Sequence, residues 1–176
     1  MKRLVGVDDA LARINADGVL QTEICAALES LADGLPDSLD ADLTARLAPI
    51  LNSSWSEHVS LQEDAIFPIL KRCHAGSDAL ILQIEQLEIE HGMIADSNRE
   101  ITEQFDLALQ GIEPSIDMLG YMLRGAFLDR RRHLDCERRV FATMLPATLA
   151  PVDREVLLRW LSSHAWPRAL SNSAVG

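Results

Sequence analysis

Residues 78–110 read DALILQIEQLEIEHGMIADSNREITEQFDLALQ, and this stretch decides the fold. Its apolar positions recur at intervals of three and four residues, the spacing of one face of an α-helix. That face consists of Leu80, Ile84, Leu87, His91, Ile94, Asn98, Ile101 and Phe105. A long helix that is apolar along one face needs partner helices to cover it, so the stretch predicts a helical bundle.

Helix-breaking residues divide the rest of the chain into segments of similar length. The breakers are Gly34, Pro36, Gly76, Gly111 and Pro146. We expect helices at about 8–33, 39–74, 78–110, 114–145 and, shorter, 151–165. Pro114 and Pro151 suit the first turn of a helix, where a missing N–H is tolerated, and Ser77 is a suitable N-cap. Pro49 and Pro68 predict a kink or a break inside the second segment.

Four long helices joined by short connections favour an all-α, up-down-up-down antiparallel four-helix bundle with a short fifth C-terminal helix. We expect a single domain over residues 1–166 and a flexible tail over residues 167–176. The first and fourth segments carry the same spacing of apolar residues. Their faces run through Ile14, Gln21 and Ile24, and through Leu123, Arg130 and Val140.

The composition excludes several classes of function. The net charge is −11 and no apolar run is long enough to span a bilayer, which disfavours nucleic acid and membranes as partners. The basic run DRRRHLDCERR at 129–139 contains interleaved acids and predicts a solvated face. Three cysteines without a paired spacing, and no visible signal peptide, predict a cytoplasmic protein.

Polar residues interrupt each apolar face at its middle, and those interruptions lie at one height. Counted in residues from the predicted turns, one polar residue of each long helix falls at the same level, because every helix rises equally per residue. These residues are Asp17, His58, His91 and His133. Gln62 and Glu137 follow one turn further along their helices. The pattern suits either a metal site or a hydrogen-bonded core network, since unpaired polar groups are costly to bury.

The two helical hairpins also resemble each other. Asp17 precedes His58 by 41 residues, and His91 precedes His133 by 42. HVSLQEDAIFPIL, which begins at His58, and HLDCERRVFATML, which begins at His133, share the histidine, a polar residue four positions on and apolar residues after it. The sequence therefore reads as two copies of one unit.

At these residues the chain resembles the hemerythrin-like domain, or HHE cation-binding domain, over about residues 8–145. That family is a four-helix bundle with a non-haem di-iron centre, whose ligands are His, His-x3-Glu, His and His-x3-Glu. The resemblance implies that His58, His91, His133 and Glu137 are metal ligands. The Phe67-Pro68 pair also matches the family pattern.

Two positions depart from that pattern. Asp17 occupies the level of the first histidine, and Gln62 replaces the second-helix glutamate. Glu63 lies next to Gln62 but about 100° away around a regular helix. The irregularity expected near Pro68 keeps it as a candidate. The predicted metal-binding residues are His58, His91, His133, Glu137, Asp17 and Glu63.

The resemblance implies one or two non-haem iron ions and a small ligand such as oxygen or nitric oxide, or the sensing of iron itself. Imidazole and carboxylate ligands also suit manganese or zinc. No nucleophile–base pair or phosphate loop is present, so an enzyme is not the expected class. The alternative is a bundle that has lost its metal and acts as a protein-interaction module.

Arg130 lies one turn before His133 on the same face, and a fixed cation there opposes a bound metal ion. Three roles are open for it. It can stack on Trp55, it can neutralise Asp17 or Glu137, or it can form a salt bridge at the edge of the bundle. We favour the salt bridge.

Overall fold

The computed structural model describes residues 7–144 and 150–164, and describes side chains for 12–141 and 150–164. The tail predicted at residues 167–176 lies outside the described residues. The elements in chain order are α1 (Val7–Gly34), α2 (Ala41–Ser60), the π-helix η1 (Leu61–Ile66), α3 (Phe67–Cys73), α4 (Asp78–Leu109), α5 (Ile116–Met144) and α6 (Pro151–Ser163).

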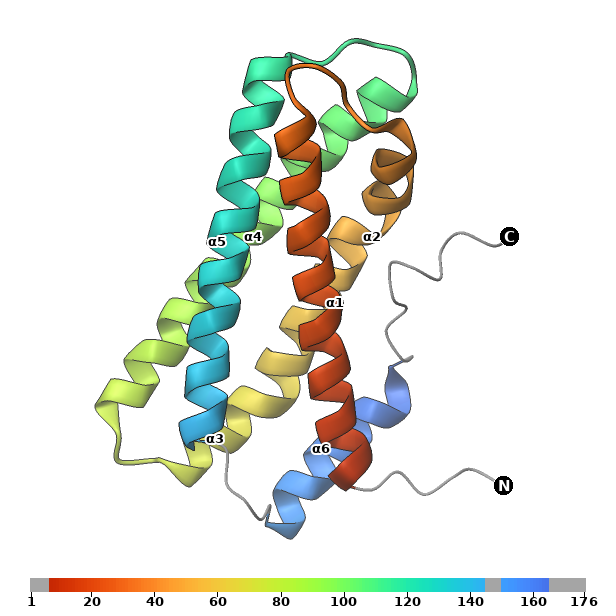
Figure 1. Cartoon of the computed structure of the whole chain (residues 1–176). Helices are drawn as coiled ribbons and strands as arrows, with labels where there is room; N and C mark the ends of the chain where they lie inside the picture. Colours follow the sequence, from red (N-terminus) through yellow and green to blue (C-terminus); the bar gives the residue numbers. More distant parts are fainter. Residues whose placement is uncertain (1–6, 145–149, 165–176) are drawn as a thin grey trace, which may run out of the picture.

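The long helices form a ring in which each packs antiparallel to its neighbours (Figure 1). Helix α1 lies beside α5 and α2, and α4 lies between α2 and α5. The short helix α6 contacts α1 and η1 at the end of the bundle opposite the α1–α2 turn. The predicted four-helix bundle with a fifth C-terminal helix is therefore confirmed. No described helix is long and apolar enough to cross a membrane.

Local hydrogen bonds explain where the helices begin and end. Ser77 Oγ accepts from the backbone N–H of Leu80 at 3.4 Å, which confirms the predicted N-cap of α4. Gly111 adopts a φ of 78° and closes the C-terminal turn of α4. Helix α5 begins at Ile116, so the expectation that Pro114 lies in its first turn was wrong. The carbonyl of Ser115 accepts the first helical bond, from Leu119 N at 2.8 Å, which leaves Pro114 outside.

The disturbance predicted inside the second segment occurs at Pro68 and not at Pro49. Helix α2 runs through Pro49 without interruption. Pro68 is the second residue of α3, which follows directly on η1. Proline has no N–H and its ring clashes with the carbonyl four residues before it, and a π-turn accommodates both problems by widening the helix.

Two apolar clusters fill the bundle, one at each end of the histidine level. The first is built from the α1–α2 and α4–α5 turn ends and includes Leu28, Leu47 and Phe105. The second includes Ile66, Leu80 and Trp160, so it reaches under α6. All eight residues of the predicted face of α4 are buried, polar ones included. Polar side chains are thus enclosed at mid-height of the bundle.

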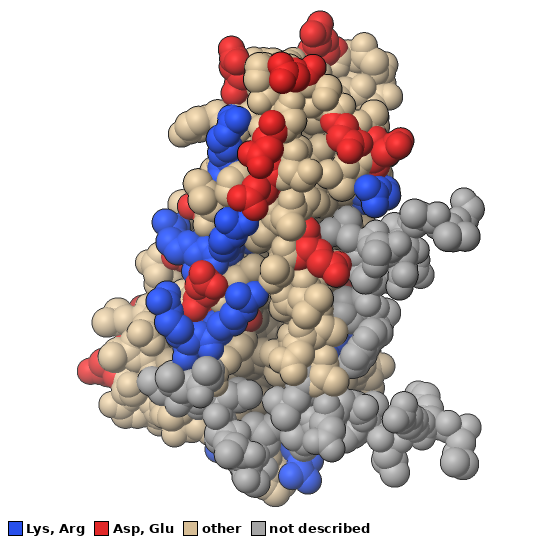
Figure 2. All heavy atoms as spheres, in the orientation of Figure 1, with Lys and Arg blue, Asp and Glu red and all other residues tan. Residues whose placement is uncertain are grey.

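Charge is unevenly spread over the surface. Figure 2 shows basic side chains gathered along α5, with acidic side chains between them and around the α1–α2 turn end. Arg131 pairs with Glu29 of α1 at 2.7 Å, and Arg138 pairs with Asp135 at 3.3 Å. The basic run of α5 is thus paired with acidic neighbours at these positions.

Candidate metal centre

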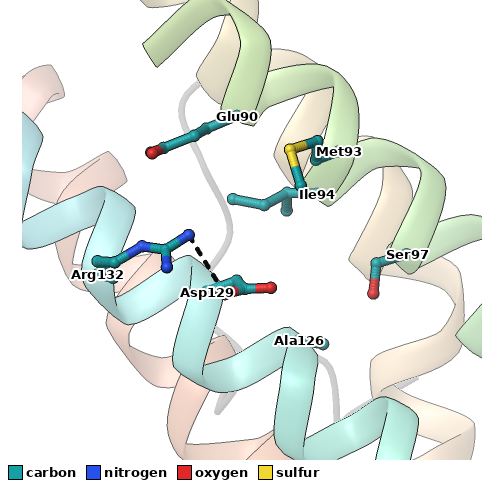
Figure 3. A pocket seen from close by; sticks show the side chains of 7 residues that line it. All are labelled: Glu90, Met93, Ile94, Ser97, Ala126, Asp129 and Arg132. Atoms are coloured by element: carbon teal, nitrogen blue, oxygen red, sulfur yellow. Dashed lines mark ion pairs between the residues drawn. The ribbon is translucent and has the colours of Figure 1, made fainter. Parts of the chain in front are cut away.

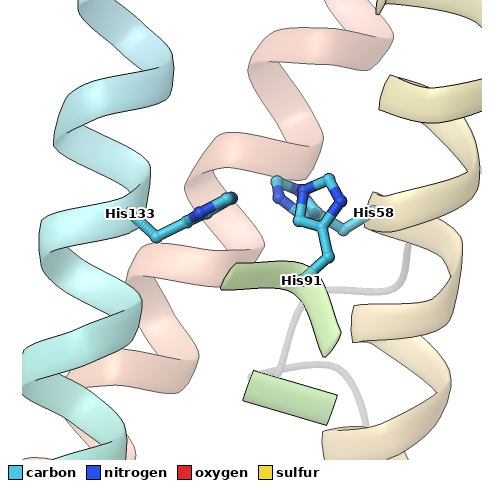
Figure 4. A group of neighbouring side chains, drawn as sticks. All are labelled: His58, His91 and His133. Atoms are coloured by element: carbon cyan, nitrogen blue, oxygen red, sulfur yellow. The ribbon is translucent and has the colours of Figure 1, made fainter. Parts of the chain in front are cut away.

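Three histidines from three helices meet inside the bundle (Figure 4). His58 comes from α2, His91 from α4 and His133 from α5, and none is more than 2% exposed. One ring nitrogen of each lies within 4.8 Å of the corresponding nitrogens of the other two. Equal rise along antiparallel helices predicted this shared level, and the structure confirms it.

Each imidazole is held from outside by a carboxylate. The Nδ1–O pairs are His58 with Asp17 at 2.6 Å, His91 with Glu63 at 2.7 Å and His133 with Glu90 at 3.0 Å. A carboxylate can only accept, so each Nδ1 carries the proton that it donates. The Nε2 of a neutral ring then presents its lone pair to the interior, which is the arrangement of metal-binding histidines in proteins.

The interior of the cluster contains one amide and one carboxylate. Gln62 Nε2 lies 2.8 Å from His58 Nε2, and Gln62 Oε1 lies 3.2 Å from His91 Nε2. Glu137 Oε2 lies 3.4 Å from His58 Nε2. That oxygen and His133 Nε2 are both buried, and neither makes a hydrogen bond with any residue the structure describes. Three ring nitrogens therefore lie within 4.8 Å of one another, and the Glu137 oxygen lies beside one of them.

Burial and nearby charges set the protonation of this cluster. Burial lowers the pKa of His133 to about 2, and its histidine neighbours act in the same direction. Burial also lowers the pKa of His91, although the hydrogen bond to Glu63 opposes it. Burial disfavours the charged form of His58 too, but Glu137 and Asp17 outweigh it and raise the pKa. Burial raises the pKa of Glu137, although the charge of His58 opposes it.

The π-helix explains why adjacent residues both reach the cluster. In a regular helix Gln62 and Glu63 point about 100° apart. The wider turn of η1 reduces that angle, so Gln62 enters the interior while Glu63 reaches His91 Nδ1 from the outer side. The irregularity expected near Pro68 thus brings Glu63 to the cluster.

Aromatic rings enclose the histidines. Trp55 stacks on His58 with ring centroids 4.7 Å apart, and its indole N–H donates to the carbonyl of His91 at 3.0 Å. The ring of Phe67 lies parallel to that of His91 at 5.8 Å. Such walls exclude water, and they strengthen electrostatic interactions within the cluster.

A second polar layer lies one turn from the histidines, and we call it the arginine layer. It consists of Gln21, Ser54, Asn98 and Arg130. Arg130 is fully buried; its guanidinium donates to Gln21 Oε1 and, at 2.8 Å, to Asn98 Oδ1. It also lies 4.5 Å from the centroid of the Trp55 ring.

These contacts correct the role that we favoured for Arg130. No carboxylate of the described residues lies within ion-pair distance of its guanidinium, so the predicted salt bridge was wrong. The stacking on Trp55, a role left open, is confirmed. Amide oxygens on α1 and α4 accept from the two terminal nitrogens of the arginine, whereas its buried Nε makes no hydrogen bond with a described residue.

The predicted residues thus divide into an inner and an outer group. His58, His91, His133 and Glu137 face the interior, whereas Asp17 and Glu63 contact outer ring nitrogens. Their assignment as metal ligands stays a prediction. Sequence reasoning missed Glu90, which holds His133. Its position directly before His91, on the side of α4 that faces α5, was the available signal.

The geometry fits one metal ion. Tetrahedral ligands about 2.1 Å from an ion are about 3.4 Å apart, so the imidazoles need only a modest inward rotation from their present separation. Three imidazole nitrogens suit zinc, iron or manganese, and a carboxylate oxygen, Glu137 Oε2, lies 3.4 Å from one of them, His58 Nε2. The carboxylates on the Nδ1 atoms fix the rings in the tautomer that binding requires.

Comparisons of the chain with family models, with curated proteins and with solved structures found no match. The class that the structure defines is an all-α bundle with a buried three-histidine group able to hold a metal ion.

Proposed function

We propose that this protein is a hemerythrin-like bundle that binds one divalent metal ion, non-haem iron in the first instance, through His58, His91, His133 and Glu137. Asp17, Glu63 and Glu90 orient the three imidazoles from outside. The single observation that carries the proposal is the buried Nε2 of His133, which makes no hydrogen bond with a described residue.

Protons alone do not satisfy the cluster. A proton on His58 Nε2, together with a Gln62 amide turned by 180°, gives hydrogen bonds to both His58 and His91. With Glu137 ionised, it leaves His133 Nε2 unpaired, because no further hydrogen-bond donor of the described residues faces it. A metal ion accepts the lone pairs of all three imidazoles at once, and it replaces the proton of His58.

The donor set favours a single ion over a pair. A carboxylate that bridges two ions supplies charge and two oxygens, and Gln62 supplies neither a charge nor a second oxygen. The remaining carboxylates near the cluster are committed to Nδ1 atoms. A bound iron ion with four protein ligands keeps open positions, at which a small ligand such as oxygen or nitric oxide can bind.

The decisive experiment is elemental analysis of untagged protein, both as purified and after anaerobic reconstitution with ferrous iron. We expect a single ion per chain in the wild type and almost none in His133→Ala, because that variant loses a donor from the centre. His164→Ala is the matched control, since His164 stacks on Trp160 and is not part of the three-histidine group.

Three outcomes contradict the proposal. A reconstituted wild type without metal refutes the site and leaves the hydrogen-bonded bundle as an interaction module. Full metal content in His133→Ala refutes the assignment of ligands. Two ions per chain refute the single-ion stoichiometry, although metal binding itself then stands.

A further inference from the structure

Three surface hollows lead toward the histidine cluster, and each ends at a different carboxylate. The hollow between α4 and α5, about 70 Å³, ends at Glu90, and the ion pair of Arg132 with Asp129 lies beside it (Figure 3). The hollow between α2 and α4, about 370 Å³, ends at Glu63 and His91. The groove between α1 and α5, about 690 Å³, ends at Glu137.

The carboxylates at the ends of the three hollows differ in their contacts with the histidines. Glu90 and Glu63 are both bonded to the outer nitrogen of a histidine, at 3.0 Å and 2.7 Å. Those two hollows are therefore closed by hydrogen bonds between a carboxylate and an imidazole N–H. Glu137 instead contacts an inward-facing ring nitrogen: its buried Oε2 lies 3.4 Å from His58 Nε2 and makes no hydrogen bond with a described residue. Glu137 thus belongs both to the wall of the α1/α5 groove and to the interior of the cluster, as His91 does in the α2/α4 hollow.

The α1/α5 groove has room and apolar walls. Ile14, Val19, Leu134 and Phe141 line it, and Val19 is 59% exposed. Gly18 opens the α1 side, because a Cβ built on it meets no atom within 4 Å. The basic residue of the groove, Arg138, is already bonded to Asp135 and Thr22. The groove volume falls in the range of small-molecule sites.

From this geometry we infer that the α1/α5 groove is the binding site and entrance for a small uncharged molecule with an apolar body, which reaches the centre at Glu137. The inference rests on the proposed function in one respect only, that a metal ion lies behind Glu137. An anion is disfavoured, because it would lose water beside the carboxylates of Glu23 and Glu137. An uncharged molecule can bind with its apolar part against the four apolar side chains of the groove wall.

The test is a titration of ¹⁵N-labelled protein with benzyl alcohol, followed by amide chemical shifts. It is run on metal-free and on zinc-loaded protein. We expect the shifts to concentrate on the groove segments 14–23 and 134–141. Binding of benzyl alcohol should weaken at least about tenfold in Gly18→Leu, because the new side chain fills the groove. Benzoate should also bind about tenfold more weakly than benzyl alcohol.

Gly92→Leu is the matched control. Gly92 lies in the α2/α4 hollow, is also inside a helix, and a Cβ built on it also meets no atom within 4 Å. This variant should bind benzyl alcohol as the wild type does. No binding, shifts centred on the α2/α4 hollow, or unchanged binding by Gly18→Leu would each overturn the inference. Equal binding of benzoate would overturn the preference for uncharged molecules.

The proposed groove and the proposed metal site can be refuted independently of each other. If the wild type retains no zinc, the proposed metal site fails, and the titration of metal-free protein still decides the groove. If zinc is retained but benzyl alcohol binds elsewhere, the metal site stands and the entrance is wrong.

Discussion

The bundle buries two polar layers one helical turn apart, and they satisfy their charges in opposite ways. The arginine layer contains a fixed cation surrounded by amides, with Gln21 and Asn98 as acceptors. The histidine cluster contains no fixed cation. It has inward-facing nitrogens and a buried carboxylate, Glu137, beside three further carboxylates on its outer side.

This difference supports the proposal that the histidine cluster, and not the arginine layer, binds a ligand. A fixed arginine cannot leave, so its layer fills one role in the fold and contributes specificity of packing. Among the described residues His133 Nε2 and Arg130 Nε both lack a hydrogen-bond partner, but only His133 Nε2 has a lone pair that a metal ion can accept. Such a group is expected where a protein binds something from outside. Trp55 contacts both layers.

The largest expected effect is the stabilisation of the histidine cluster by metal. Zinc at about a thousandfold excess over its Kd should raise the free energy of unfolding of the wild type by about 4 kcal/mol. Urea denaturation with and without zinc measures this. His133→Ala should gain almost nothing, because it lacks one donor. Arg130→Met should keep most of the gain. If both variants lost the stabilisation by zinc to the same extent, the two layers would not differ in metal binding.

The next effect concerns the arginine layer. Arg130→Met should lower the free energy of unfolding by about 2–4 kcal/mol, because it leaves the oxygens of Gln21 and Asn98 buried without donors. The triple variant Arg130→Met, Gln21→Leu, Asn98→Leu should recover much of that loss, since apolar side chains need no partners. Denaturation curves of the three proteins decide this. A triple variant less stable than the single one would mean that the layer contributes net stability.

A smaller effect is expected from the carboxylates outside the histidines. Glu90→Gln should weaken metal binding about tenfold to a hundredfold, because an amide orients His133 less strongly and makes it a weaker donor. Competition with a chromogenic chelator measures the affinity. Glu85→Gln is the control, as Glu85 is exposed on the same helix. Equal losses in both variants would show a general effect of charge and no specific role for Glu90.

The smallest effect is the pH dependence of the metal-free protein. Burial holds the pKa of His133 near 2, far below its usual value of 6.5. Below about pH 6.5, His133 therefore binds a proton in the unfolded chain but stays neutral in the folded protein. Stability from this group is complete above about pH 6.5 and falls as the pH decreases. Between about pH 7 and pH 5.5 the loss should be about 1 kcal/mol.

His133→Gln, which cannot be protonated, should remove that part of the pH dependence, as measured by urea denaturation at both pH values. His58 has a raised pKa and acts in the opposite sense, but it is present in both proteins. An unchanged slope in His133→Gln would show that His133 does not stay neutral in the fold.

The spacing of apolar residues was enough to predict the four long helices and the level of the polar residues. The face of α4, from Leu80 to Phe105, was predicted in full, because helical period and rise are local properties of the chain. The same counting placed His58, His91 and His133 together. A start of α5 at Ile116 was missed, since Pro114 is acceptable both within and before a first turn.

The contacts that the buried polar side chains make with other helices could not be predicted from the sequence, because they depend on how the helices pack. Whether Arg130 meets a carboxylate or an amide depends on how α1 and α4 are rotated about their axes, and packing of the whole core sets that rotation. The roles of Glu90 on His133 and of Glu63 on His91 depend on rotamers and on the widened turn before Pro68. The groove at Gly18 likewise exists only because α1 and α5 lie side by side. Period and rise are properties of one helix, whereas a contact between two helices is fixed only when the core is packed.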